Sequence, residues 1–306
     1  MLNVVFATRN RAATLANVLD SYRRLIPPEG GWRLVVVDNG SIDDTPGVLA
    51  AAAEDLPLLA LHEPSPGKNR ALNRALPHLD GDLAVFTDDD VLPDPAWLCA
   101  LRAAADVHPD TTLFGGTVLP AWSEPRPAWL REDCVDFGVL YSQLRRPSGP
   151  CDFRSVWGPN MAVRRAVFDD GHRFDEVIGP NAAQAHYRMG SESSFNARLQ
   201  AAGATARFVA EAVVHHIVRP EQMTERWILD RAYRHGLGVA SYDRPGFADG
   251  PPILGLPRGV LKRRVLSAAA AAAVRFLPPS PRRLHLLFQE RWYAGVADHC
   301  RQERAS

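Results

Sequence analysis

Three consecutive aspartates, Asp88, Asp89 and Asp90, directly follow the apolar run "LAVFT". Carboxylates at the end of an inner strand can hold a hard divalent ion that also binds phosphate oxygens, as magnesium and manganese do. Short acidic runs are also common in solvated turns, so the triplet alone leaves both interpretations open. Asp94 has a simpler interpretation, because an aspartate directly before Pro95 is typical of a helix N-cap.

Two further segments carry side chains suited to a nucleotide. Asp38 ends the run "VVVD", where a carboxylate can accept a hydrogen bond from a base N–H or a ribose hydroxyl. Gly67 and Lys68 precede an amphipathic segment, and a turn, a helix N-terminus and a lysine together favour an anion such as a diphosphate. A solvated basic helix face explains these two residues equally well. Ser41 and Asp44 have the spacing of an N-cap pair.

A carboxylate and a histidine pair stand further along the chain. Glu192 falls in the first turn of an expected helix that has Ser191 as its N-cap and Gly203 just past its end. The helix dipole stabilises a carboxylate there with or without a function, and the helix start could also aim it outward as a general base. His215 and His216 end a strand-like run and would point to opposite faces. At most one of them can therefore complete a metal shell begun by carboxylates.

The elements that must position these residues follow a simple alternation. Short apolar runs predict strands at 2–8, 33–38, 57–62, 82–88 and 111–118. Amphipathic segments between them predict helices at 13–25, 43–54, 68–79 and 95–107. The pattern predicts an α/β fold with a mostly parallel sheet, in which ligands bind beyond the carboxyl ends of the strands. The polar clusters "TRNR", "DNGSIDD" and "DDD" all follow strands.

The rest of the chain is less regular. Residues 119–157 are rich in Pro and Trp and are expected to form long loops or a lid. Trp122, Trp129 and Trp157 could stack on a sugar acceptor, although core packing is favoured for one or two of them. The tail beyond residue 244 combines arginines with an apolar face. It suits a dimer contact, peripheral membrane docking or a solvated helical appendage.

The bulk properties exclude some classes of function. The 306 residues allow one large domain, or one domain with an appendage. The 35 basic and 35 acidic side chains cancel, so no net field favours nucleic acid as a partner. The four cysteines are widely spaced, which suits a reducing compartment and disfavours a cysteine zinc site. We read no signal peptide, and the longest apolar run is broken by Arg275, so we expect a cytoplasmic protein, either free or peripheral to the inner face of the membrane.

Seven segments, in order along the chain, resemble the family 2 glycosyltransferases of the GT-A fold. They are "ATRNR", "VVVDNGSIDDT", "GKNRALN", "FTDDDVLPDPAWL", "GPNMAVRRAVF", "GSESSFNARL" and "VVHHIVRPEQMTERW". The resemblance implies a Rossmann-like, mostly parallel sheet with flanking helices in a catalytic domain at residues 1–240. Its nucleotide-binding half would be residues 1–118 and its donor-sugar and acceptor half residues 119–240. A helical C-terminal extension would follow at residues 241–306.

The resemblance also implies a metal-dependent nucleotide-sugar site. The residues implied to contact the nucleotide are Thr8, Arg9, Asp38, Gly67, Lys68, Asp88 and Asp89. Asp90 and His216 would bind a Mg²⁺ or Mn²⁺ ion that bridges the diphosphate. Asn160 and Trp157 would lie beside the donor sugar or the acceptor. Glu192 matches the base that deprotonates the acceptor hydroxyl, so that transfer inverts the anomeric carbon.

What the family implies for the reaction is transfer of a sugar, with a lean to UDP-linked donors, to a glycan, lipid-linked or small-molecule acceptor. Such reactions serve the synthesis of cell-surface polysaccharide, glycolipid or glycoconjugate. The chain departs from the family pattern at Leu72, where many members have Arg, and at Ser191 and Ser194, which leave Glu192 without an acidic neighbour. A degenerate relative that binds without transfer is therefore an alternative. A sugar-phosphate nucleotidyltransferase is another, but "ATRNRAATL" lacks the glycines of its phosphate loop.

Overall fold

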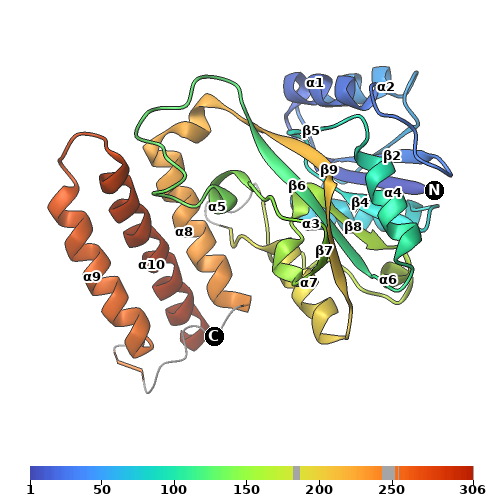
Figure 1. The fold of residues 1–306 in the computed structure, drawn as a ribbon. Helices are drawn as coiled ribbons and strands as arrows, with labels where there is room; N and C mark the ends of the chain where they lie inside the picture. Colours follow the sequence, from blue (N-terminus) through green and yellow to red (C-terminus); the bar gives the residue numbers. More distant parts are fainter. Residues whose placement is uncertain (182–186, 243–251, 254, 306) are drawn as a thin grey trace. The chain divides into compact units, whose positions relative to one another are not determined.

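The computed structural model of the protein forms two compact units, and it describes residues 1–181, 187–242, 252–253 and 255–305 (Figure 1). The first unit consists of the described residues of Met1–Ala121, Ser142–Ala185 and Ser191–Ile217. The second unit consists of those of Trp122–Tyr141, His186–Gly190 and Val218–Ser306.

Strands of the first unit build one sheet. Within the described residues its order is β3-β2-β1-β4-β8-β6-β9-β5, and β7 pairs with β9. The strands are β1 (Leu2–Thr8), β2 (Trp32–Asp38), β3 (Leu58–His62), β4 (Leu83–Phe86), β5 (Val91–Pro93), β6 (Leu113–Trp122), β7 (Gly149–Cys151), β8 (Met161–Arg164) and β9 (Ala206–Val218).

The sheet is mixed, and its N-terminal strands are parallel. Strand β1 pairs in parallel with β2 and β4, and β2 pairs in parallel with β3. Strand β8 runs antiparallel to β4 and β6, as β9 does to β5 and β7. The predicted α/β class is confirmed. The parallel strands end together, so the polar residues that follow them lie at one edge.

Helices cover both faces of this sheet. Along β1, Val4 belongs to one apolar core and Val5 to the other, because successive side chains of a strand point to opposite faces. The first face packs against α1 (Ala12–Tyr22), α2 (Thr45–Ala52) and α4 (Trp97–Val107). The second face packs against α3 (Lys68–Ala75), α6 (Ala166–Asp169) and α7 (Ser191–Ala201). Short 3-10 turns are η1 (Leu76–His78), η2 (Phe153–Ser155) and η3 (Gly158–Asn160).

Two local predictions around the aspartate triplet are wrong. The strand predicted at 82–88 is shorter, because β4 ends at Phe86; the aspartates follow it, as expected, in the turn between β4 and β5. Thr87 still follows β1 through its N–H, but its hydroxyl turns to donate to the Pro159 carbonyl at 2.8 Å. Asp94 does not cap α4, whose N-cap is Ala96.

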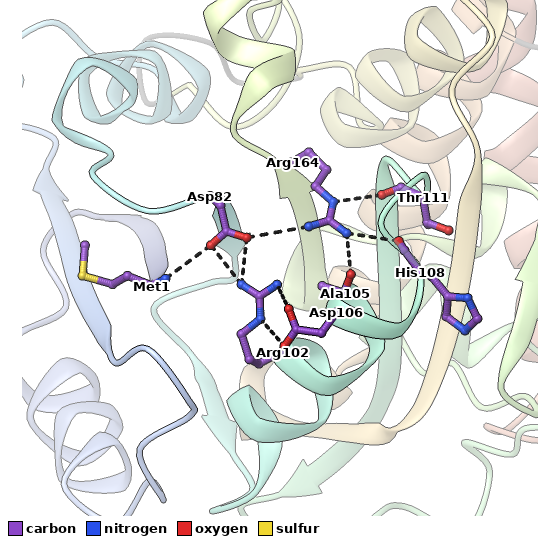
Figure 2. Close-up of polar contacts among 8 residues, drawn as sticks. All are labelled: Met1, Asp82, Arg102, Ala105, Asp106, His108, Thr111 and Arg164. Carbon is purple, nitrogen blue, oxygen red and sulfur yellow. Dashed lines mark hydrogen bonds and ion pairs between the residues drawn. The ribbon is translucent and has the colours of Figure 1, made fainter.

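The amino-terminal end of the sheet carries a charged network around Asp82 (Figure 2). Its carboxylate contacts the Met1 amino group at 3.3 Å, the Arg102 guanidinium at 2.8 Å and the Arg164 guanidinium at 3.7 Å. Arg164 also donates to the carbonyls of Ala105, His108 and Thr111 at 2.6 to 3.2 Å. This one side chain therefore satisfies carbonyls that the C-terminal end of α4 and the following turn leave without intrahelical partners.

The second unit is helical. Its helices are α5 (Phe137–Tyr141), η4 (Pro220–Met223), α8 (Glu225–Tyr242), α9 (Arg258–Val274) and α10 (Pro281–Ala305). Trp122 and Trp129 pack against one apolar core of this unit, in line with the core role favoured for such residues. In the described part of the chain, no helix combines the length and the apolarity needed to cross a bilayer.

Candidate active site

The carboxyl ends of β1 and β2 place two of the expected nucleotide residues side by side. Thr8 and Asp38 are the last residues of these strands and are partners in the parallel register. Both are buried. The Thr8 hydroxyl donates to the Asp89 carboxylate at 2.8 Å, so the end of β1 fixes the middle aspartate of the triplet. Arg9 follows and is partly exposed.

Lys68 joins the triplet to Glu192. Its ammonium nitrogen lies 2.6 Å from Asp88 Oδ1 and 2.8 Å from Glu192 Oε1. The three side chains are only 17 to 24% exposed, so the charges are largely out of water. Gly67 precedes Lys68 at φ 142°, a conformation that side chains rarely adopt, and thereby allows α3 to start with Lys68 in its first turn. Lys68 is thus a cation of the protein itself that contacts Asp88 of the triplet.

Burial and pairing oppose each other in this bridge. Burial alone would lower the pKa of Lys68, but the charges of Asp88 and Glu192 outweigh it and raise that pKa above its usual range. Burial alone would raise the pKa of Glu192, but Lys68 lowers it to about 2. Glu192 is therefore an ionised carboxylate at neutral pH. For Asp89, burial and then the charge of Asp90 raise the pKa to about 6.

Glu192 is held from several sides. It lies in the first turn of α7 (Ser191–Ala201), which confirms the predicted helix, although Ser191 is the first residue of the helix and not its N-cap. The Ser191 hydroxyl donates to Glu192 Oε2 at 2.6 Å. A Cβ atom added at Gly158 would lie 2.6 Å from Glu192 Oε1, so only glycine leaves room for the carboxylate in this position. These contacts fix one oxygen on Ser191 and the other on Lys68.

Asp90 and His216 form a second pair. His216 Nε2 lies 3.4 Å from Asp90 Oδ1, and both side chains are about nine-tenths buried. Arg11 approaches the same carboxylate at 3.6 Å. His215 points elsewhere and lies 2.9 Å from Asp94 Oδ1. Of the two histidines, His216 is therefore the one that lies beside the triplet.

The chemistry of Asp90 and His216 fits a divalent ion. Neighbouring ligands on an octahedral ion lie about 3 Å apart, close to the separation of these two atoms. Among the described residues, no three His, Cys, Asp or Glu side chains form a ready metal site. Two protein ligands are nevertheless enough for magnesium or manganese that binds together with substrate phosphates, because such ions keep several water or phosphate ligands.

Asn160 and Trp157 differ in how accessible they are. Asn160 is fully buried, accepts from Trp97 Nε1 at 2.9 Å, and donates to the carbonyls of Thr117 and Ala212. Its polar atoms are thus bonded within the protein. Trp157 is partly exposed, and its indole N–H donates to the Arg154 carbonyl at 2.5 Å. The ring of Trp157 is therefore the more accessible of the two groups.

Sequence reasoning missed several residues that organise the site. Asn39 accepts from the Gly67 N–H at 2.9 Å and donates to the carbonyls of Glu63 and Ser65, so it shapes the loop before α3. His62 Nδ1 lies 3.3 Å from Asp38 Oδ2. Only the position of Asn39 directly after Asp38 offered a signal. The role of a neighbour such as Gly158 appears only once the chain is folded.

Comparison with known proteins completes the description. The model of the family described as glycosyl transferase family 2 matches residues 3–171. A succinoglycan biosynthesis protein, ExoM, of Rhizobium meliloti is 26% identical over 230 residues, which are 74% of this chain and 70% of that protein. A mannosyltransferase structure from Pyrobaculum calidifontis, in complex with GDP-Man and Mn²⁺, has a TM-score of 0.61 at 20% identity and covers 100% of this chain and 88% of that one. Residues 1–349 of Staphylococcus aureus TarS with UDP-GlcNAc give 0.56 at 14% identity, covering 99% and 91%. At these identities the structures establish the fold alone.

Proposed function

The chain belongs to glycosyl transferase family 2, and from this premise we propose that it transfers a sugar from a nucleotide-diphosphate sugar to a hydroxyl acceptor, with inversion at the anomeric carbon. One observation carries the proposal. Lys68 links Asp88, in the triplet expected to face the nucleotide, to Glu192, the expected base, which lies 124 residues after Lys68. One cation thus contacts both an aspartate of the proposed nucleotide site and the proposed catalytic base.

Glu192 is the base in this proposal. Its carboxylate accepts the proton of the acceptor hydroxyl while the acceptor oxygen bonds to the anomeric carbon. The bond from that carbon to the diphosphate oxygen breaks, and its electron pair leaves with the diphosphate. One base is sufficient, because the leaving diphosphate has no need of protonation, and a paired acid is a requirement of hydrolases. The ionised state of Glu192 supports this role.

The donor end of the site is divided among the remaining residues. We place Asp38 and Arg9 against the base and ribose, Asp88 at the ribose, and Lys68 with its preceding Gly67 at the diphosphate. Asp90 and His216 would hold Mg²⁺ or Mn²⁺, which supplies positive charge to the leaving diphosphate. Thr8 supports the site through its bond to Asp89, which in turn borders Asp90. Trp157 and Asn160 have proposed roles further from the phosphates.

At the sugar end, Trp157 and Asn160 take different roles. The partly exposed ring of Trp157 offers an apolar platform for the donor sugar or the acceptor. Asn160 acts as a positioning residue, because its buried amide joins β6, β9 and α4 and it shares the short turn η3 with Gly158, which borders Glu192. Loss of Asn160 would therefore act on catalysis through the position of the base.

The donor and acceptor are proposed by class. The family resemblance favours UDP, while the names of the related structures include both GDP-Man and UDP-GlcNAc. The name of the Rhizobium relative refers to succinoglycan biosynthesis. We propose that this chain likewise serves polysaccharide or glycoconjugate synthesis, with a glycan, a lipid-linked sugar or a small molecule as acceptor.

The test is a binding and turnover experiment on the wild type and Glu192→Gln. Thermal shift with UDP-, GDP- and dTDP-sugars, with and without Mn²⁺, identifies the donor. The variant is expected to keep the donor-induced shift and to lose about 10²- to 10⁴-fold in turnover, the usual contribution of a general base. Undiminished turnover would exclude Glu192 as the base. Donor binding without turnover in the wild type would favour the degenerate alternative, and no binding of any nucleotide sugar with Mn²⁺ would refute the proposal.

A further inference from the structure

Over its last three turns, the exposed face of α9 lacks the polar residues that a solvated helix normally carries. Its buried face consists of Val260, Ser267 and Ala271, packed toward the core that α9 shares with α8 and α10. The opposite face carries only apolar side chains over its last three turns. These exposed residues are Val265, Leu266, Ala269, Ala272 and Ala273. They recur at the spacing of one helix face.

The stripe continues into the turn after the helix. Phe276 is 95% exposed and Leu277 is 54% exposed, and both stand directly beyond α9. Val265 and Leu266 are each 59% exposed. Large apolar side chains this exposed occur singly on most proteins, but here four of them belong to one continuous segment. Such a surface calls for an apolar partner.

Basic residues border this apolar stripe at both ends. From residue 251 to residue 289 the sequence has seven Arg and Lys residues and no Asp or Glu. Two of the seven are engaged inside the second unit, because Arg264 pairs with Glu290 and Arg283 pairs with Glu225. The other five point to solvent or lie at its edge and make no ion pair with the described residues. They are Arg258, Lys262, Arg263, Arg275 and Arg282.

We propose that this surface of α9 and the turn that follows it docks on an anionic lipid membrane, with the helix lying in the interface. An uncharged stripe between basic residues fits the boundary between anionic headgroups and acyl chains. A second copy of the chain fits poorly, because a two-fold contact would bring the same five cations against each other. The surface lies on the membrane and does not cross it, since α9 is short and carries charges near both ends.

The experiment is flotation of the full-length chain with vesicles. One set contains one part phosphatidylglycerol to two parts phosphatidylcholine, and the other contains phosphatidylcholine alone. We expect the chain to float with the anionic set and to bind the neutral set at least about tenfold more weakly. About 1 M NaCl, where the screening length is about 3 Å, should reduce the anionic binding to the neutral level.

Two double variants separate the two parts of the surface. Lys262→Glu with Arg263→Glu should weaken binding at least about 25-fold, since each basic residue near the surface contributes about fivefold. Phe276→Ser with Leu277→Ser should weaken it at least about tenfold at both low and high salt, because the lost burial is apolar. The matched controls are Arg24→Glu and Val107→Ser, an exposed cation and an exposed apolar residue outside this surface, and both should bind like the wild type.

Three results would overturn the proposal. The first is that the wild type binds neither vesicle, and the second is that the double variants bind the anionic vesicles as tightly as the wild type does. The third is a dimer, seen by light scattering, that Phe276→Ser with Leu277→Ser dissociates while vesicle binding is absent. Because these residues are exposed, circular dichroism should show the variants folded. The salt dependence of the wild type tests the electrostatic part without any variant. The docking is independent of sugar transfer, so turnover on a water-soluble acceptor should stay unchanged in every variant.

Discussion

Lys68 has two tasks that compete for one ammonium group. Without a donor it pairs with both Asp88 and Glu192, and its charge keeps the pKa of Glu192 low. In the proposed reaction it faces the diphosphate, which carries more negative charge than either carboxylate. A shift of Lys68 toward the diphosphate would remove the opposing charge from Glu192, and burial would then raise the pKa of the carboxyl. Donor binding would thus prepare the base.

The substitution Lys68→Met tests the bridge through stability. It leaves two buried carboxylates without their cation, so we expect a loss of about 3 kcal/mol in the free energy of unfolding at neutral pH. In the wild type the pKa of Glu192 is lowered from 4.5 to about 2. Its ionised form therefore stabilises the fold at pH values above 4.5, and this stabilisation is lost as the pH falls toward about 2. In the variant burial raises the pKa of Glu192, so that contribution is present below 4.5 and is lost as pH rises. The two pH dependences act in the same direction, so the loss in free energy of unfolding caused by Lys68→Met is largest near pH 7 and smaller near pH 4.

Chemical denaturation at a series of pH values measures this penalty. The chain's other lysine, Lys262, is exposed, and Lys262→Met should show no such pH dependence. A penalty for Lys68→Met that stays constant from pH 4 to pH 7 would contradict the coupling between Lys68 and Glu192.

Gly158 makes a second prediction at the scale of single residues. In Gly158→Ala the new Cβ would lie 2.6 to 2.9 Å from the Oε1, Cδ and Cγ atoms of Glu192, so this flexible side chain must move rather than the backbone. Misplacement of a catalytic group by about 1 Å can cost about 10²-fold in rate, so we expect kcat to fall by that order. Donor affinity, measured by thermal shift, should change little. Wild-type turnover of a folded Gly158→Ala variant would show that the position of Glu192 is unimportant.

At the scale of elements, Arg164 joins the end of β8 to the end of α4. Burial and then the neighbouring Arg102 lower the pKa of Arg164, and Asp82 offsets part of this lowering. Arg164→Met removes the side-chain donor to the three carbonyls, of which that of His108 also accepts the Thr111 N–H, and should destabilise the fold by about 1 to 3 kcal/mol in urea denaturation. The substitution Arg164→Lys should retain less than half of the stability that Arg164→Met loses, because lysine lacks the planar guanidinium that reaches several carbonyls. Turnover per folded molecule should not change, since Arg164 lies at the opposite end of the strands from the site.

The exposed Arg24 supplies the control, and Arg24→Met should leave stability unchanged. Equal stability of Arg164→Met and the wild type would show that water satisfies these carbonyls as well as the guanidinium does.

Elements were predictable where local periodicity determines them, and less so where distant contacts do. The alternation of apolar runs and amphipathic segments gave β1, β2 and β3 and their helices, because each run needs only its own neighbours. The end of β4 was misplaced, since Thr87 turns toward Pro159, 72 residues away. The position of Asp94 before Pro95 predicted a helix cap, but its carboxylate instead pairs with His215, 121 residues further along the chain.

The candidate site follows the same division. The sequence predicted which residue types gather beyond the strands, and the strand order then brings Thr8 and Asp38 together. It could not predict that Lys68 bridges Asp88 and Glu192, because that contact depends on how α3 and α7 pack on the same face of the sheet. Strand alternation alone left His215 and His216 open, the family resemblance pointed to His216, and the register of β9 against β5 pairs His216 with Val91, next to Asp90.

At the scale of the whole molecule, the helices of the second unit decide where the chain can be divided. Helices α8 and α10 approach each other at glycines. A Cβ at Gly236 would lie 2.1 Å from the Trp292 carbonyl oxygen, and a Cβ at Gly295 would lie 2.1 Å from that of Tyr233. The division into a catalytic domain at 1–240 and an extension at 241–306 is a proposal, and it cuts through this contact.

Truncation after residue 240 tests that division directly. Removal of α10 would expose the buried face of α8, which includes Ile228, Ala232 and Leu237, so we expect a lower melting temperature and binding of a dye for apolar surfaces. The full chain is the reference, and Ala273→Ser, on the exposed face of α9, controls for changes in the tail that leave α8 covered. A truncated chain with the melting temperature of the full chain would support an independent domain ending at 240. A loss of stability would instead make α8, α9 and α10 one folding unit, because a helix with an uncovered apolar face has no other means of burying it.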